Sequence, residues 1–232
     1  MSEFMNCEVL YRGAFAMTRV TLAHGESIKA EAGAMVAMSN TIDIEGKLEG
    51  GIFGAIGRMF SGESFFFQTL RAKRGSGEIL LAPAMPGDVY SLELDGQTPY
   101  TVHRGGFLAA SEGLNVTTQV QNLVKGLFSG EGFFVVGVSG RGTLLIDSYG
   151  AIHPIDVPAG EEVIIDNSHL VAWPAAMKYK IETVSSGIFS TVTSGEGFVC
   201  RFTGPGRVYI QSRNFMSLVD LISHSLPINR GK

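Results

Sequence analysis

The residue types that most often carry chemistry are few in this sequence and stand far apart. Its five histidines are His24, His103, His153, His169 and His224. No two of them are two or four residues apart, so no strand or helix carries the paired imidazoles of a local metal site. We therefore predict no metal-ligating residues, while histidines from distant parts of the chain could still converge in the fold.

Motifs for nucleophiles and nucleotides are also missing. Ser139 lies in Gly137-Val138-Ser139-Gly140, which does not fit the Gly-x-Ser-x-Gly elbow of hydrolases. The Gly-x-Gly pairs of the chain lack the third glycine and the following helix of a dinucleotide site, and no Gly-Lys-Ser/Thr occurs. The sequence thus predicts no catalytic and no cofactor-binding residue. We do not expect an enzyme, although the question stays open at this point.

One short phrase occurs three times, with a glutamate at the same place in each copy. The copies are Ser61-Gly62-Glu63-Ser64-Phe65, Ser129-Gly130-Glu131-Gly132-Phe133 and Ser194-Gly195-Glu196-Gly197-Phe198. If three units surround one axis, Glu63, Glu131 and Glu196 could meet at a cation or a partner. The phrase is also typical of a turn whose serine bonds the backbone and whose glutamate faces water, and we favour this interpretation.

Each phrase leads into an apolar run and then into a Gly-x-Gly pair followed by a second apolar run. The pairs are Gly75-Ser76-Gly77, Gly140-Arg141-Gly142 and Gly204-Pro205-Gly206. The runs are rich in β-branched and aromatic residues, which favour strands. Because a tight turn between two strands often needs backbone angles that only glycine adopts cheaply, we predict a hairpin at each pair.

Short strands separated by turns, repeated three times, predict an all-β fold. We expect an antiparallel β-sandwich built from three pseudo-repeats with pseudo-threefold symmetry, since a closed body suits such divergent copies better than an open solenoid. The repeats would cover about residues 8–81, 82–146 and 147–211. They would form a single β domain over residues 1–211, followed by a C-terminal helix and tail in 212–232.

Short helices are expected at a few places. In residues 116–128, apolar side chains at helical spacing predict a helix just ahead of the second phrase, and 51–60 and 187–192 could be its equivalents. Residues 215–222 predict an amphipathic helix, with Asn214 as its cap and Pro227 beyond its end.

The composition favours a protein that covers part of its surface with a partner. Charged residues make up 17% of the chain, against a usual share of about 25%, and hydrophobic residues make up 45%. A surface with so little charge predicts a homo-oligomer, with a lipid surface as the rival interpretation. The net charge of −4 and the lack of a basic stripe argue against nucleic acid, and we interpret Arg71-Ala72-Lys73-Arg74 as a solvated strand end.

The N-terminal residues and the cysteines indicate a cytoplasmic protein. The chain begins without a positive and apolar leader and has no run of about 18 apolar residues. Cys7 and Cys200 are its two cysteines, so one disulfide is conceivable but a disulfide framework is not.

The three phrases, the Gly-x-Gly strands and Ala30-Glu31-Ala32-Gly33-Ala34-Met35 resemble a family of uncharacterised bacterial and archaeal proteins that includes a protein of the altered-inheritance-of-mitochondria series. The resemblance covers about residues 5–212. It implies a fold similar to that of the tryptophan RNA-binding attenuation protein, and it implies no catalytic residues. RNA binding does not follow from such a fold.

Three functional hypotheses remain. The leading one is an uncharacterised, non-enzymatic and oligomeric β-sandwich protein, most simply a homotrimer, with a structural or interaction role. The second is a peripheral membrane or scaffold protein that uses the apolar segments 51–56 and 123–128. The third is a small-molecule sensor or enzyme at a sheet mouth near His169 and Trp173, which predicts a deep pocket with convergent polar groups there.

Overall fold

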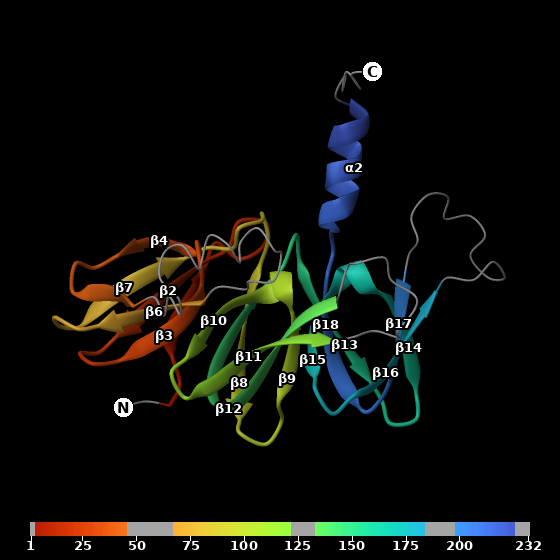
Figure 1. The fold of residues 1–232 in the computed structure, drawn as a ribbon, viewed down its shortest axis with the longest axis horizontal. Helices are drawn as coiled ribbons and strands as arrows, with labels where there is room; N and C mark the ends of the chain where they lie inside the picture. The colour runs from red at the N-terminus through yellow and green to blue at the C-terminus, as the bar shows by residue number, and fades with distance from the viewer. Residues whose placement is uncertain (1–2, 46–66, 122–132, 184–197, 226–232) are drawn as a thin grey trace.

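The computed structural model describes residues 3–45, 67–121, 133–183 and 198–225. Within these ranges the chain forms antiparallel sheets and one C-terminal helix, α2 (Phe215–Ser225) (Figure 1). The prediction of a mostly β protein with a helix at its C-terminal end is therefore confirmed. The strands fall into three consecutive segments, which we call the first, second and third segment: residues 3–81, 89–147 and 152–211.

The first segment contains two layers of strands. Its strands are β1 (Asn6–Leu10), β2 (Met17–Leu22), β3 (Ser27–Glu31), β4 (Met35–Met38), β5 (Ile42–Glu45), β6 (Phe67–Ala72) and β7 (Gly77–Leu81). One layer has the order β1-β2-β7-β4, and in the other β6 lies between β3 and β5. The alternation in β2 shows why such layers form, since Thr18, Val20 and Leu22 are buried and the residues between them are less so.

The second segment uses one long strand for both of its layers. Its elements are β8 (Val89–Asp95), β9 (Tyr100–His103), the short 3₁₀ helix η1 (Arg104–Gly106), β10 (Phe107–Ser111), β11 (Leu114–Gln121) and β12 (Phe133–Asp147). The first half of β12 pairs with β9 and β11, and its second half pairs with β8 and β10. The long strand thus passes from one layer into the other.

The third segment again divides its strands between two layers. Its elements are β13 (Ile152–Val157), β14 (Glu162–Asp166), the short 3₁₀ helix η2 (Asn167–His169), β15 (Leu170–Pro174), β16 (Lys178–Thr183), β17 (Phe198–Thr203) and β18 (Gly206–Gln211). The strand β17 lies between β14 and β16, while β18 lies between β13 and β15.

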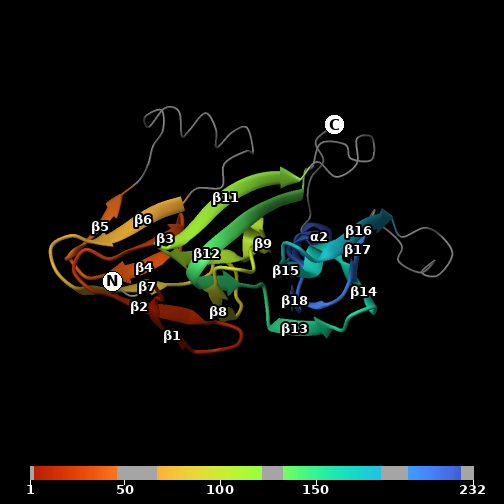
Figure 2. The ribbon, with the colours of Figure 1, turned by 90° about the horizontal axis from the view of Figure 1, so that it is seen from below.

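Two strand pairings join the segments, which lie side by side in Figure 2. The strand β10 pairs with β3, and β15 pairs with β9. These pairings create a sheet of eleven strands, with the order β13-β18-β15-β9-β12-β10-β3-β6-β5 and with β8 and β11 attached to β12. The structure has three hydrophobic cores, which include Ile79, Phe107 and Trp173, and each of them also takes in residues of a neighbouring segment.

The predicted hairpins at the Gly-x-Gly pairs are wrong. The strands β6 and β7 belong to different sheets, as do β17 and β18, and Gly140 and Gly142 lie inside the continuous strand β12. Gly75, Gly140 and Gly142 do have positive φ values, of 144°, 103° and 152°. At these glycines the chain therefore bends from one layer of strands into the facing layer. It does not turn back to pair with the preceding strand, as a hairpin would.

The helix predicted in residues 116–128 is also wrong as far as the structure describes it. Residues 116–121 belong to β11, which pairs with β12 from Leu114↔Gly140 to Gln121↔Phe133. Val116, Thr118 and Val120 recur with a period of two as well as four, so the same residues fit a strand, and the neighbouring strand decides. The other predicted short helices, at 51–60 and 187–192, lie outside the described residues.

Candidate functional site

The three glutamates of the repeated phrase cannot be assigned a role from the structure. Glu63, Glu131 and Glu196 lie outside the described residues, as do the apolar segments 51–56 and 123–128. In the described part of the chain, no cluster of three or more histidine, cysteine or acidic residues is placed to hold a metal ion.

The sheet mouth expected near His169 and Trp173 is not formed by these side chains. Trp173 is buried, and its ring contacts Tyr179 and Phe202 edge to face, at centroid distances of 5.7 and 5.6 Å. His169 instead bonds the main chain, with Nδ1 2.7 Å from the carbonyl oxygen of Gln211. The tryptophan is therefore part of the third hydrophobic core and cannot form the wall of a ligand site.

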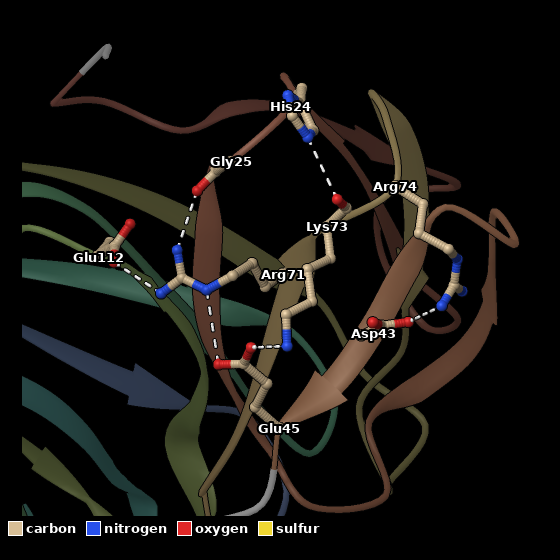
Figure 3. A network of polar contacts seen from close by, with 8 residues as sticks. All are labelled: His24, Gly25, Asp43, Glu45, Arg71, Lys73, Arg74 and Glu112. Carbon is tan, nitrogen blue, oxygen red and sulfur yellow. Dashed lines mark hydrogen bonds and ion pairs between the residues drawn. The ribbon is translucent and has the colours of Figure 1, made fainter.

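The basic cluster at residues 71–74 is neutralised by neighbouring acids. Figure 3 shows Arg71 between Glu45 and Glu112, at 3.5 and 3.0 Å, and Lys73 3.2 Å from Glu45. Arg74 forms an ion pair with Asp43. These side chains lie at the surface beside β5 and β6, so the cluster is a set of exposed ion pairs that ties neighbouring strands together.

A buried acid at the end of β12 was not found by sequence reasoning. Asp147 is buried, and its Oδ1 atom has no hydrogen-bond partner in the described part of the chain. Burial raises the pKa of this carboxyl well above its usual range, and the nearby Glu31 raises it further. The pKa of Glu31 is itself raised by burial and is lowered in part by Arg104. Asp147 and Glu31 together can keep a proton in the folded protein, because two buried or partly buried carboxyl groups that lie close together are unfavourable when both are ionised.

The pKa of a histidine in the same segment, His103, is shifted in the opposite direction. His103 ends β9 and caps η1, where its Nδ1 accepts a hydrogen bond of 3.3 Å from the backbone N–H of Gly105. Burial, helped by the positive charge of Arg104, lowers the pKa of His103 to about 4. The neutral imidazole is therefore the form that fits the fold, since the protonated ring would lose its acceptor.

Several exposed apolar side chains gather on α2, which projects away from the sheets (Figure 1). The helix has no buried residue, and the large side chains of Phe215, Met216, Leu221 and Ile222 are 47–65% exposed. Phe215, Leu218, Val219 and Ile222 follow each other at helical spacing and form one apolar stripe, opposite Ser217, Asp220 and His224. We call these four residues the α2 stripe.

The start of α2 is held to the third segment by a chain of hydrogen bonds. The Oδ1 atom of Asn214 accepts a bond of 2.8 Å from the N–H of Met216, which confirms the predicted cap. The Nδ2 atom of Asn214 donates to Ser168 Oγ at 2.8 Å, and that hydroxyl donates to Asp166 Oδ1 at 2.6 Å. The region that the sequence suggested as a ligand mouth is thus the anchor of a projecting helix.

The sheets, their three cores and the projecting helix define a multi-layered antiparallel β protein, and its comparison with known proteins gives the family. A family model described as mitochondrial biogenesis AIM24 matches residues 7–213. The chain belongs to this family, which confirms the resemblance drawn from the repeated phrases. The further likeness to the attenuation protein stays a prediction.

Two relatives from Streptococcus pyogenes support the assignment. An uncharacterised protein of the serotype M6 strain is 37% identical over 221 residues, which cover 92% of this chain and 88% of that protein. An X-ray crystal structure of a protein of the same species matches with a TM-score of 0.79 and 35% identity, over 96% of this chain and 100% of that one. Neither description names an activity.

Proposed function

We propose that this protein is a non-enzymatic homo-oligomer with a structural or interaction role, and that its three segments are copies of one unit with pseudo-threefold symmetry. A trimer is the assembly we expect. The observation that carries the proposal is the α2 stripe, which belongs to a helix that is anchored at its first turn and has none of its residues buried against the described part of the chain.

The length of α2 explains why it needs a partner. A helix of eleven residues is marginal in water on its own, since isolated helices shorter than about 12–15 residues rarely persist. Full burial of a Leu, Ile or Phe side chain stabilises by about 1.5–3 kcal/mol. Contact of the α2 stripe with a second copy would therefore supply the stabilisation that its own chain does not.

A protein surface suits α2 better than a membrane surface. Helices that lie on membranes are typically rich in Lys and Arg on their polar face. The polar face of α2 carries Asp220 and His224 and has no Lys or Arg. In the described part of the chain, no helix is long and apolar enough to cross a membrane.

Two further observations support parts of the proposal. The same strand pairings occur in the three segments, with β7, β18 and the second half of β12 each lying between two neighbours of corresponding order. Cys7 and Cys200 are both free, and burial raises the pKa of the Cys200 thiol to about 12. Unpaired, unreactive cysteines fit the reducing cytoplasm, where we expect the protein to act.

The test replaces two apolar residues of the α2 stripe by acids. We expect Phe215→Asp/Ile222→Asp to lower the mass in light scattering from that of an oligomer toward that of the 24.8 kDa chain, because charges would enter the buried contact. The matched control is Ser217→Asp/His224→Asp, which adds two acids on the face opposite the stripe and should leave the mass unchanged. A wild-type protein that is monomeric at micromolar concentration would overturn the proposal.

Co-sedimentation with vesicles that contain anionic lipid tests the rival function in the same samples. Binding by a monomeric wild-type chain, lost in the stripe variant and kept in the control, would replace the oligomer with a peripheral membrane protein. No binding by the wild type supports the protein–protein role.

A further inference from the structure

The two joins between segments use corresponding strands in the same register. In the first join, Ala109 lies opposite Ala30 and Ala110 opposite Lys29. In the second join, Ala172 lies opposite Val102 and Trp173 opposite Thr101. In each segment a short turn separates two strands. At each join, the strand after this turn (β10 or β15) pairs with the strand before the same turn in the previous segment (β3 or β9).

Internal landmarks establish which residues correspond. In all three segments one strand (β3, β9 or β14) ends four residues before the next strand begins: Glu31 before Met35, His103 before Phe107, and Asp166 before Leu170. The following strand then has a bulge at its second residue, which is Val36 in β4, Leu108 in β10 and Val171 in β15. Hence β4 corresponds to β10 and β15, and β14 corresponds to β3 and β9.

By this correspondence the molecule has two unused joining strands. The strand β4 is the last strand of its four-stranded sheet, and β14 is the last strand of its three-stranded sheet, with no further strand paired to either in the described part of the chain. The two strands lie at opposite ends of the molecule in both views (Figures 1 and 2). They therefore cannot pair within one chain as they stand.

The free strands β4 and β14 expose side chains at positions that a neighbouring strand covers at the joins. Leu108 and Val171 are 0% and 1% exposed at the two joins, whereas Val36 at the same position is 54% exposed. On the other strand, Thr101 is 8% exposed where β15 covers it, whereas the corresponding Ile164 is 49% exposed. Each free strand thus leaves in water a large apolar side chain, whereas Leu108, Val171 and Thr101 at corresponding positions of the joins are buried.

We propose that β4 of one copy pairs with β14 of the next copy in the register of the two internal joins. Ala37 would then lie opposite Ile165, and Met38 opposite Ile164, in an antiparallel pair. The pairing rests on the proposed homo-oligomer and specifies its interface. It would cover Val36 and Ile164 and would remove two apolar sheet edges, which are aggregation hazards when they stay open.

The interface is heterologous, because the two copies contribute different surfaces. Such contacts close into a ring when the rotation between copies allows it, and they extend as a filament otherwise. A ring of three copies would satisfy the trimer of the proposed function and would leave no β4 or β14 strand unpaired.

The first experiment blocks each edge separately. Val36→Asp and Ile164→Asp should each abolish the wild-type oligomer in light scattering, because each removes one side of every β4–β14 contact, without which we do not expect the α2 stripe to hold the copies together. The matched control is Ile44→Asp on β5, since Ile44 is 46% exposed but belongs to no joining strand. Circular dichroism checks that the variants are folded, as all three substituted side chains are exposed in the single chain.

Mixing the two variants tests the direction of the contact. The Val36→Asp chain keeps an intact β14, and the Ile164→Asp chain keeps an intact β4. An equimolar mixture should therefore form a complex of two chains, whereas each variant alone stays monomeric. A mixture that contains only monomers would overturn the head-to-tail pairing.

A covalent test does not depend on loss of assembly. Met38→Cys/Ile164→Cys, made in a Cys7→Ser background, should yield chains linked by disulfides between copies under mild oxidation, seen on a non-reducing gel. Met38→Cys/Ile44→Cys in the same background is the control and should not crosslink.

The outcomes separate the two proposals. A wild-type oligomer that persists in both edge variants and does not crosslink would overturn the β4–β14 interface and leave the proposed homo-oligomer standing. A monomeric wild-type chain would overturn both. Loss of assembly in the two edge variants, with assembly kept in Ile44→Asp, supports the interface.

Discussion

The ends of β12 and β18 occupy corresponding places in the second and third segments but carry different side chains. Ile146 pairs with Phe107 and Ile210 with Leu170, so the next residues, Asp147 and Gln211, correspond. The amide of Gln211 donates to the carbonyl oxygen of Ser168 at 2.9 Å and accepts from the N–H of Tyr149 at 3.0 Å. The carboxyl of Asp147 is buried with its Oδ1 unpartnered among the described residues.

This difference indicates that one backbone position can serve two purposes. In the third segment a satisfied amide helps to fix η2, from which Ser168 reaches the cap of α2. In the second segment a buried acid next to Glu31 makes stability depend on protonation. We therefore expect the third segment to be sensitive to packing and the second to be sensitive to pH.

The largest effect should come from the aromatic core of the third segment. Trp173→Ala should lower the free energy of unfolding by about 3–5 kcal/mol, because it leaves a cavity beside Tyr179 and Phe202. Urea titrations at pH 5 and pH 8 should give the same loss. A loss that changes strongly with pH would contradict the assignment of packing to this segment.

Asp147→Asn should stabilise the protein at neutral pH by about 1–3 kcal/mol, because the amide has the same shape but cannot be ionised at a buried position where no partner offsets the charge. The folded-state pKa of Asp147 is raised, so folding favours the protonated acid. Its contribution to stability is complete below the unfolded pKa of about 3.9 and is lost as pH rises toward the folded pKa. The gain of the variant over the wild type should therefore vanish in acid, which urea titrations across this range can measure.

The reciprocal change sharpens the comparison. Gln211→Glu places a carboxylate against the carbonyl oxygen of Ser168 and removes the hydrogen bond that the amide donates. We expect a destabilisation of about 1 kcal/mol at neutral pH. An increase in stability for Gln211→Glu, or a loss for Asp147→Asn at neutral pH, would show that the two positions do not differ in the way proposed.

The smallest effect should come from an exposed ion pair of the third segment. Arg207 donates to Asp156 through Nε and Nη2, at 2.6 and 2.8 Å, and both side chains lie at the surface. Arg207→Ala should leave the urea midpoint within experimental error, since water and salt screen such pairs. A clear loss of stability would mean that this pair contributes more than packing arguments allow.

Local patterns in the sequence predicted much of the secondary structure. The glycine-bounded apolar runs are strands, and Asn214 caps a helix that begins at Phe215. The hairpins and the helix at 116–128 were wrong because glycine spacing and apolar period do not specify which strand becomes the neighbour. Asp147 escaped notice because nothing in its neighbourhood along the chain distinguishes a buried acid from an exposed one.

The sequence by itself determined most of the strands, the cap of α2 and the family, because these depend on side chains a few residues apart and on motifs that persist along the chain. Only the tertiary structure decided that each Gly-x-Gly pair changes layers, that Trp173 is in a core, and that Val36 and Ile164 are left uncovered at opposite ends. The physical reason is that burial and strand pairing are set by residues distant in the chain, such as Ala109 against Ala30.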